Sequence, residues 1–148
     1  MNNEVIYRNI WTDKQIDEVR QLSGPILITG ASGFIGMHCV LQLLEQGYKV
    51  RGTLRNLDRE NHLREVFSQH TQAIDQLEFV QTDLLKDDGW SEALSECEYV
   101  LHVASPFPSE RPENEDDLIR PAVDGTLRVL KAASTANVKR VVLTSSAA

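Results

Sequence analysis

The sequence predicts an α/β fold, built as a doubly wound parallel sheet of five strands in the order 3-2-1-4-5. Apolar runs of strand length alternate with segments of helical periodicity throughout most of the chain. The runs ILIT, YVLHV and VVLT are continuously apolar, which is typical of parallel strands covered on both faces. Because right-handed crossovers bring the first and fourth strands together, we expect a ligand between their carboxyl ends.

Five strands are expected, over residues 25–29, 48–54, 77–81, 99–103 and 138–144. The intervening helices are expected from 34 to the glycine at 47, and over 57–69, 86–95 and 116–136. Leu63, Val66 and Phe67 place the second of these helices with one apolar side toward the sheet. Pro121 predicts a local distortion in the last helix.

Residues 1–23 differ from the rest, and we separate them from a domain over 24–148. Thr12 and Gln15 have the spacing of a capping box, which predicts a short amphipathic helix. Three apolar residues follow at helical spacing: Ile16, Val19 and Leu22. We expect this helix to pack on the domain surface rather than to dock a partner.

The composition excludes several classes of function. The 148 residues carry 15 Lys and Arg against 22 Asp and Glu, for a net charge of -7. An acidic chain is a poor ligand for nucleic acid or for an anionic membrane surface. No secretory signal or membrane-spanning run is visible, and two cysteines are too few for a disulfide framework. We therefore expect a cytoplasmic protein with reduced thiols.

The strongest motif is the loop TGASGFIG, which lies between the first strand and the first helix. Gly30 permits a sharp turn, Gly33 lets the backbone approach a pyrophosphate, and Gly36 allows close helix packing. The amide groups at the helix start would bind phosphate oxygens. The motif predicts dinucleotide binding, with a ligand-free glycine turn as the alternative.

The second strand predicts which dinucleotide binds. It ends in RGTLRN, where an NAD-binding domain usually has an acidic residue for the ribose hydroxyls. Arg55 occupies that place and Arg59 follows it, and a guanidinium suits a 2′-phosphate. The sequence therefore favours NADP (NADPH) over NAD. The alternative, a solvated surface charge, fits Arg51 better than Arg55.

Six motifs in order resemble the extended short-chain dehydrogenase/reductases: TGASGFIG, VRGTLR, TDLL, LHVASPF, RPAVDGTLRVLKAA and VKRVVLTSSAA. Within them, the chain is most similar to the dihydroflavonol-4-reductase-like and aldehyde-reductase-like group of epimerase/dehydratase domains. The resemblance covers residues 25–148 and implies a Rossmann fold that binds NADP(H).

The resemblance also implies the roles of individual residues. Its pyrophosphate loop corresponds to Gly30, Ser32, Gly33, Phe34, Ile35 and Gly36. Its 2′-phosphate site corresponds to Arg55 and Arg59, and its adenine contact to Asp83 and Leu84. Its fourth-strand end, along the cofactor, corresponds to Val103, Ala104 and Ser105. Its fifth strand ends at Thr144 and Ser145, and its catalytic serine is Ser146.

The chain departs from the family at the general acid, a tyrosine in a Tyr-x-x-x-Lys motif. Its tyrosines are Tyr7, Tyr48 and Tyr99, and none is followed by Lys four residues later. We therefore expect a sheet truncated after the fifth strand, without the substrate-binding part, and inactive alone. The expected function is the NADP(H)-binding portion of a reductase that transfers hydride to an aldehyde or ketone.

Two alternatives remain: a non-catalytic NADP(H)-binding or redox-sensing module, and a half completed by another chain. Val141, Val142 and Leu143 would lie on an exposed sheet edge, which predicts homodimerisation, aggregation or marginal stability. The histidines are scattered, so we expect no metal site.

Overall fold

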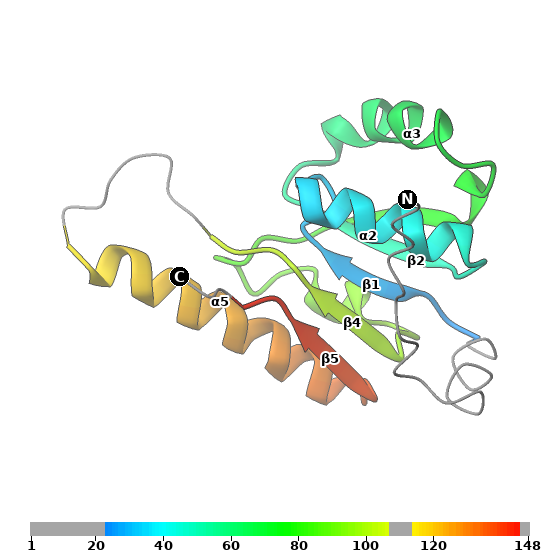
Figure 1. Cartoon of the computed structure of the whole chain (residues 1–148). Coiled ribbons are helices and arrows are strands. Elements are labelled where there is room, and N and C mark those ends of the chain that lie inside the picture. Colours follow the sequence, from blue (N-terminus) through cyan, green and yellow to red (C-terminus); the bar gives the residue numbers. More distant parts are fainter. Residues whose placement is uncertain (1–22, 107–113, 146–148) are drawn as a thin grey trace, which may run out of the picture.

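Five parallel strands form one sheet in the order β3-β2-β1-β4-β5, as Figure 1 shows. The strands are β1 (Ile26–Thr29), β2 (Val50–Leu54), β3 (Leu77–Gln81), β4 (Tyr99–His102) and β5 (Arg140–Leu143). This computed structural model describes residues 23–106 and 114–145. The predicted fold class and strand order are confirmed, and the order reverses between β1 and β4.

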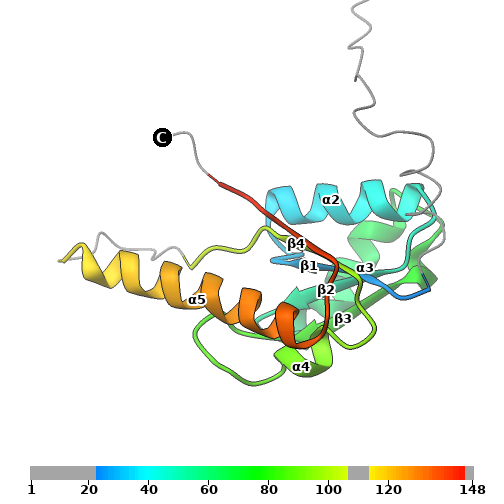
Figure 2. The ribbon, with the colours of Figure 1, turned by 90° about the horizontal axis from the view of Figure 1, so that it is seen from below.

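Helices cover both faces of the sheet (Figure 2). They are α2 (Phe34–Glu45), α3 (Glu60–Ser68), α4 (Trp90–Ala93) and α5 (Asp116–Thr135), with 3-10 turns at η1 (Leu57–Arg59) and η2 (Ile74–Gln76). One core lies beneath α2 and α3, where Ile28 meets Phe67 and its neighbours. The other lies beneath α4 and α5, where Leu27 meets Trp90 and Val129. Successive β1 side chains thus enter opposite cores, as a sheet covered twice requires.

Element ends differ from the prediction where backbone turns intervene. β2 begins at Val50 rather than 48, because Gly47 has φ +83° and the Tyr48 amide donates to Leu43 O, closing α2. The helix predicted over 86–95 is reduced to Trp90–Ala93, since Gly89 with φ 81° precedes it. β5 begins at Arg140 rather than 138.

Two further predictions concern the chain termini and the last helix. The amphipathic helix expected over residues 12–22 lies outside the described residues. Pro121 is inside α5, which extends from Asp116 to Thr135 as one helix. The bounds of α5 therefore agree within one residue with the helix predicted over 116–136.

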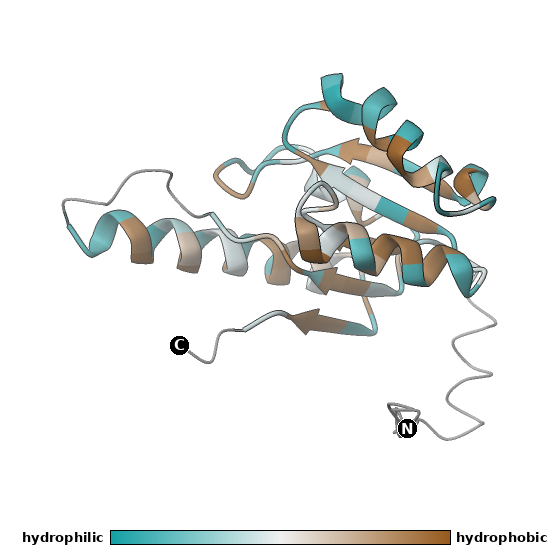
Figure 3. Cartoon of the chain, turned by 45° about the horizontal axis from the view of Figure 1, so that its top comes forward, coloured by the Kyte–Doolittle hydropathy of each residue, from teal (hydrophilic) through white to brown (hydrophobic). Residues whose placement is uncertain are grey.

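Helix α5 and the edge strand β5 carry exposed apolar side chains, and we call this part of the molecule the outer flank. Figure 3 shows hydrophobic residues in both elements. The members of the outer flank are Ile119, Val123, Leu127, Leu130, Val142 and Leu143. In β5, Val142 is 53% exposed and Leu143 is 47% exposed, as predicted for an edge strand, whereas Val141 is half-buried and packs against the core. None of the helices formed by the described residues combines the length and apolar character that crossing a bilayer requires.

Candidate functional site

The carboxyl ends of β1 and β4 lie side by side at the point where the strand order reverses. Gly30, directly after β1, has φ +73°, a conformation that favours glycine. A Cβ on Gly30 would lie 3.1 Å from the Ala104 Cα, so the two backbones nearly touch. Two segments that are distant in the sequence are therefore packed closely at the carboxyl edge of the sheet.

The glycine loop is folded tightly enough to exclude side chains at one of its positions. A Cβ on Gly36 would lie 2.1 Å from the Gly30 carbonyl oxygen, and the Gly33 amide donates to that oxygen at 3.0 Å. Gly33 is the N-cap of α2, and no side chain caps the helix there. The first turn of α2 carries no acidic residue, so no local carboxylate neutralises the positive end of the helix dipole.

The other loop residues differ in their exposure. Phe34 is 80% exposed and Ile35 is 53% exposed, while Ser32 is half-buried. The Phe34 ring packs edge-on against the His38 ring, with centroids 4.8 Å apart. The Phe34 and Ile35 side chains, at the start of α2, are thus accessible to a ligand or to another chain.

A buried polar network joins the ends of β1 and β4. The Thr29 Oγ1 lies 2.7 Å from His102 Nδ1, and it accepts the amides of Val103 and Ala104, each at 3.0 Å. Thr29 is 0% exposed and His102 is 1% exposed. Burial lowers the pKa of His102. From the sequence alone, His102 was considered only as a metal ligand, and this network was missed. The position of His102 inside the apolar run YVLHV indicates a buried side chain that needs a hydrogen-bond partner.

The predicted fourth- and fifth-strand residues gather at the same edge. The Thr144 amide and hydroxyl both donate to the His102 carbonyl oxygen, at 3.0 and 2.9 Å. Ser105 and Ser145 are exposed close to these strand ends in the sequence. Ser146, the predicted catalytic serine, lies outside the described residues.

The end of β2 presents two exposed arginines, Arg55 and Arg59. Neither guanidinium forms an ion pair with any residue in the described part of the chain. The Gln81 side chain holds the Arg55 carbonyl at 3.0 Å and so fixes the backbone there. Both cations therefore remain available to an anion.

Arg51 is not the solvated charge that the sequence suggested. Its side chain is 11% exposed, and its Nε donates to Glu78 at 2.6 Å. Its Nη1 donates to the carbonyl oxygens of Ala93 and Ser95, at 3.0 and 2.6 Å. Arg51 thus ties β2 to the end of α4, and it is unavailable to a cofactor.

The predicted adenine contact combines a turn residue with a core residue. The Asp83 carboxylate accepts the Leu85 amide at 2.9 Å, and its carbonyl accepts the Lys86 amide at 3.0 Å. Leu84 is 9% exposed and packs on α5, with its Cβ 3.1 Å from the Cβ position of Gly125. Leu84 therefore stabilises the fold, while Asp83 shapes the loop.

The cysteines have no features of a nucleophile. Burial raises the pKa of Cys97 to about 11, although the nearby Arg51 opposes that change. Burial also raises the pKa of Cys39. Within the described part of the chain, no three His, Cys, Asp or Glu side chains gather as metal ligands would.

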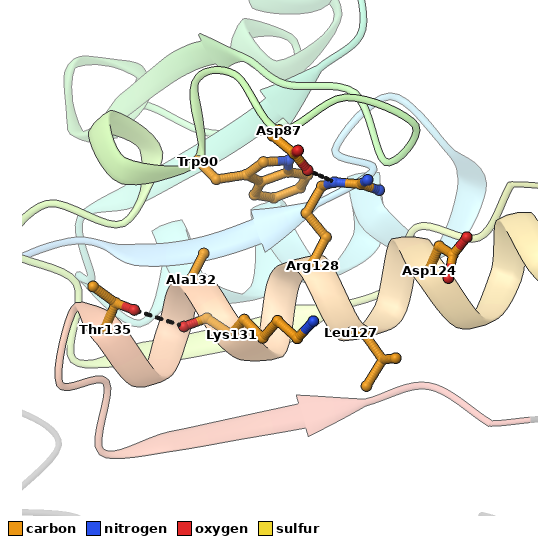
Figure 4. Close-up of a pocket in the computed structure, with 8 residues that line it drawn as sticks. All are labelled: Asp87, Trp90, Asp124, Leu127, Arg128, Lys131, Ala132 and Thr135. Atoms are coloured by element: carbon orange, nitrogen blue, oxygen red, sulfur yellow. Dashed lines mark hydrogen bonds and ion pairs between the residues drawn. The ribbon is translucent and has the colours of Figure 1, made fainter.

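A hollow lies on the outer surface between α4 and α5 (Figure 4). Arg128 crosses it to pair with Asp87, and also donates to the Leu84 carbonyl oxygen. Its lining residues are Asp87, Trp90, Asp124, Leu127, Arg128, Lys131, Ala132 and Thr135. None of them belongs to the site predicted from the sequence.

This sheet, with its glycine loop at the point of strand reversal, defines a Rossmann-type nucleotide-binding domain. Residues 26–148 match the NAD dependent epimerase/dehydratase family, and the chain belongs to that family. The fold and the family were both predicted correctly from the motifs.

Individual relatives are plant and yeast reductases. A dihydroflavonol 4-reductase of Hordeum vulgare is 42% identical over 130 residues, which are 84% of this chain and 35% of the relative. Cinnamoyl-CoA reductase 1 of Petunia hybrida is 43% identical over 131 residues, or 86% of this chain and 37% of the relative. The chain thus spans little more than a third of the curated relatives that it matches.

A solved structure extends the likeness to three dimensions. The yeast methylglyoxal/isovaleraldehyde reductase Gre2, complexed with NADPH, is 33% identical with a TM-score of 0.70. The match covers 83% of this chain and 37% of the yeast reductase. The chain therefore corresponds to part of a reductase fold.

Proposed function

We propose that residues 24–148 are the NADP(H)-binding portion of a reductase that transfers hydride from NADPH to an aldehyde or ketone. The observation that carries the proposal is the glycine cradle at the strand reversal, where Gly30 meets Ala104 and Gly36 meets Gly30. Reductases among the relatives, one of them complexed with NADPH, support the same conclusion.

The residues present fit the pyrophosphate of a dinucleotide. A Cβ on Gly33 would contact only the Gly30 carbonyl oxygen, at 3.4 Å, so its outward side is open space. A phosphate lying there would meet backbone amides at the uncapped start of α2. Ser32 would add a hydroxyl donor, and Phe34 and Ile35 would flank the entrance.

Arg55 and Arg59 would bind the 2′-phosphate that distinguishes NADPH from NADH. Both are exposed beyond the end of β2, and their guanidinium groups have no ion pair among the described residues. A bidentate arginine–phosphate contact is stronger than an ordinary hydrogen bond. Asp83 would lie near the adenine, with Leu84 as its packing support.

The nicotinamide supplies hydride when it is bound. Val103, Ala104, Ser105, Thr144 and Ser145 would line its path, and Ser146 would hydrogen-bond the carbonyl oxygen of the substrate. Reduction also needs a proton donor, and none of the three tyrosines is followed by Lys four residues later. Under this proposal, the 148 residues bind the cofactor but do not reduce a carbonyl by themselves.

Cofactor choice tests the proposal. Calorimetric titration should give tighter binding of NADPH than of NADH to the whole chain. Arg55→Ala should weaken NADPH by about ten- to a hundredfold and leave NADH almost unchanged. Arg120→Ala is the matched control, because Arg120 is an exposed arginine paired with Asp116 on α5.

Two outcomes would contradict parts of this proposal. Equal losses of NADPH and NADH affinity in Arg55→Ala would remove the 2′-phosphate assignment. No binding of either dinucleotide by the unchanged chain would remove the cofactor-binding function itself.

We also propose that the protein acts in the cytoplasm. Cys39 and Cys97 are both unbridged, and they are the only two cysteines of the sequence. Unpaired thiols are typical of a reducing compartment. Fractionation of cells, followed by immunodetection of the chain, would test the location.

A further inference from the structure

His102 is buried beneath the proposed cofactor site, at the ends of the strands that would carry it. It is the last residue of β4, is 1% exposed, and lies in register with Thr29 at the end of β1. Its side chain reaches β1, whereas its carbonyl oxygen accepts both donors of Thr144 beyond β5. One residue thus joins the carboxyl ends of three strands.

Counting donors and acceptors determines the protonation state of its ring. A threonine hydroxyl has one proton to donate and two lone pairs that accept. Both lone pairs of the Thr29 oxygen receive an amide, those of Val103 and Ala104, each at 3.0 Å. The 2.7 Å contact with His102 Nδ1 must therefore use the hydroxyl proton. Nδ1 then accepts, and the ring proton is on Nε2.

The orientation of the Thr29 hydroxyl affects the backbone at the end of β4 and the glycine loop that packs on it. Its two amide bonds hold the backbone at Val103 and Ala104, and Gly30 packs on the Ala104 backbone. The Gly30 carbonyl oxygen in turn accepts the amide of Gly33, the N-cap of α2, and lies close to Gly36. When the hydroxyl proton points to His102, the Thr29 oxygen can accept both amides. We therefore expect the separation between the glycine loop and the end of β4 to depend on the orientation of this hydroxyl.

We propose that neutral His102, protonated on Nε2, is a positioning residue that orients the Thr29 hydroxyl and thereby fixes the spacing between the glycine loop and the end of β4, where the cofactor is proposed to bind. This inference rests on the proposed NADP(H) binding and adds a residue that does not touch the cofactor. Buried and 1% exposed, His102 acts through Thr29, Val103 and Ala104.

The tautomer itself is the first test, and it requires no substitution. Nitrogen-15 NMR of the labelled whole chain distinguishes a ring nitrogen that bears a proton from one that does not. At pH 7.5, we expect unprotonated Nδ1 and protonated Nε2 for His102. A proton on Nδ1, or a doubly protonated ring, would overturn the proposal.

Matched variants then test the link to the cofactor. His102→Asn retains an acceptor close to the position of Nδ1, whereas His102→Leu has none. We expect His102→Leu to weaken NADPH by about tenfold or more and His102→Asn to stay within about threefold. Thr29→Val should resemble His102→Leu, and Thr29→Ser should resemble the unchanged chain.

Amide hydrogen exchange separates positioning from general loss of structure. In His102→Leu, the Val103 and Ala104 amides should exchange faster, while the amide of Phe67 in α3 keeps its protection. Equal NADPH affinity in the Leu and Asn variants would overturn this inference alone. Failure of the unchanged chain to bind NADPH would overturn the proposed function and the inference together.

Discussion

The end of β1, the glycine loop over residues 30–36 and the end of β4 pack together, and we call this region the seam. The seam and the outer flank at β5 and α5 are opposites in packing. At the seam, backbone segments pack closely, and the buried Thr29 hydroxyl and His102 Nδ1 are joined by a hydrogen bond. On the outer flank, Val142 is 53% exposed and Ile119 is 50% exposed. The region proposed to hold a cofactor is thus closely packed, whereas the flank has apolar surface that none of the described residues covers.

The contrast indicates that binding and stability depend on different residues. A seam made from backbone contacts has no spare volume, so even one added carbon there changes the structure. An exposed apolar flank tolerates substitution but favours association with other apolar surfaces.

The largest effect is expected at the centre of the seam. Gly36→Ala would place a Cβ 2.1 Å from the Gly30 carbonyl oxygen, a distance at which backbone must move. We expect the free energy of unfolding to fall by about 3 kcal/mol or more. Urea denaturation followed by circular dichroism measures the loss.

Gly33→Ala is the matched comparison within the same loop. Its Cβ would lie 3.4 Å from the same oxygen, an ordinary contact, so the stability should change little. NADPH affinity should nevertheless fall, because the added methyl occupies the space proposed for the pyrophosphate. Similar unfolding free energies for the Gly33 and Gly36 variants would contradict the description of the seam.

Charge on the outer flank should reduce self-association. Val142→Lys replaces an exposed edge-strand side chain with one that disfavours strand pairing, and should weaken any dimer by about tenfold or more. Light scattering across a concentration series measures the change. Ser68→Lys adds the same charge to exposed α3 and should leave the association unaltered.

An outcome without any association would also be informative. If the unchanged chain is a monomer that melts cooperatively at every concentration, the outer flank does not drive assembly. The predicted homodimer or aggregate would then be wrong.

A smaller effect is expected from pH, through the histidine of the seam. Burial lowers the pKa of His102 below the value of an unfolded histidine, about 6.5. The unfolded chain therefore binds this proton first, so stability is fully present above about pH 6.5 and declines as the pH falls below it. His102→Asn should flatten this part of the profile of melting temperature against pH. An identical slope in the variant would assign the loss to other groups.

The smallest effect is expected from an ion pair on the surface of α5. Arg120 and Asp116 are 3.1 Å apart, four residues apart on the helix, and both largely exposed. Arg120→Ala should change the unfolding free energy by less than about 0.5 kcal/mol. A loss above about 1 kcal/mol would show that this pair contributes more than solvent-screened pairs usually do.

Local patterns were sufficient to predict the sheet. Continuous apolar runs and glycine spacing predicted the five strands and the loop at Gly30, because these features depend on neighbours in the sequence. The order of the strands was predicted from the right-handed crossovers of parallel sheets. Arg55 was placed beyond β2 for the same reason. The helix at 86–95 was too long, since the left-handed conformation of Gly89 was not considered.

Contacts between distant segments could not be predicted in this way. Arg51 lies on the strand beside Glu78 and reaches the end of α4, a contact that only the folded chain brings together. The pairing of Thr29 with His102 depends on the register of two strands. Spacing within either strand does not specify that register. The assignments of individual cofactor contacts stay predictions, and Ser146 lies outside the described residues.

The bond between Thr29 and His102 also constrains when the site forms during synthesis. It joins residues 73 positions apart, whereas β1 and β2 pair across a single short crossover. During translation, β1, α2 and β2 emerge early and can pair locally, but the contact between the glycine loop and β4 forms only after β4 has been synthesised. A nascent chain that ends before His102 therefore displays the glycine loop without the partner that holds it in place. We expect affinity for the nucleotide to arise late in synthesis, when the fourth strand leaves the ribosome.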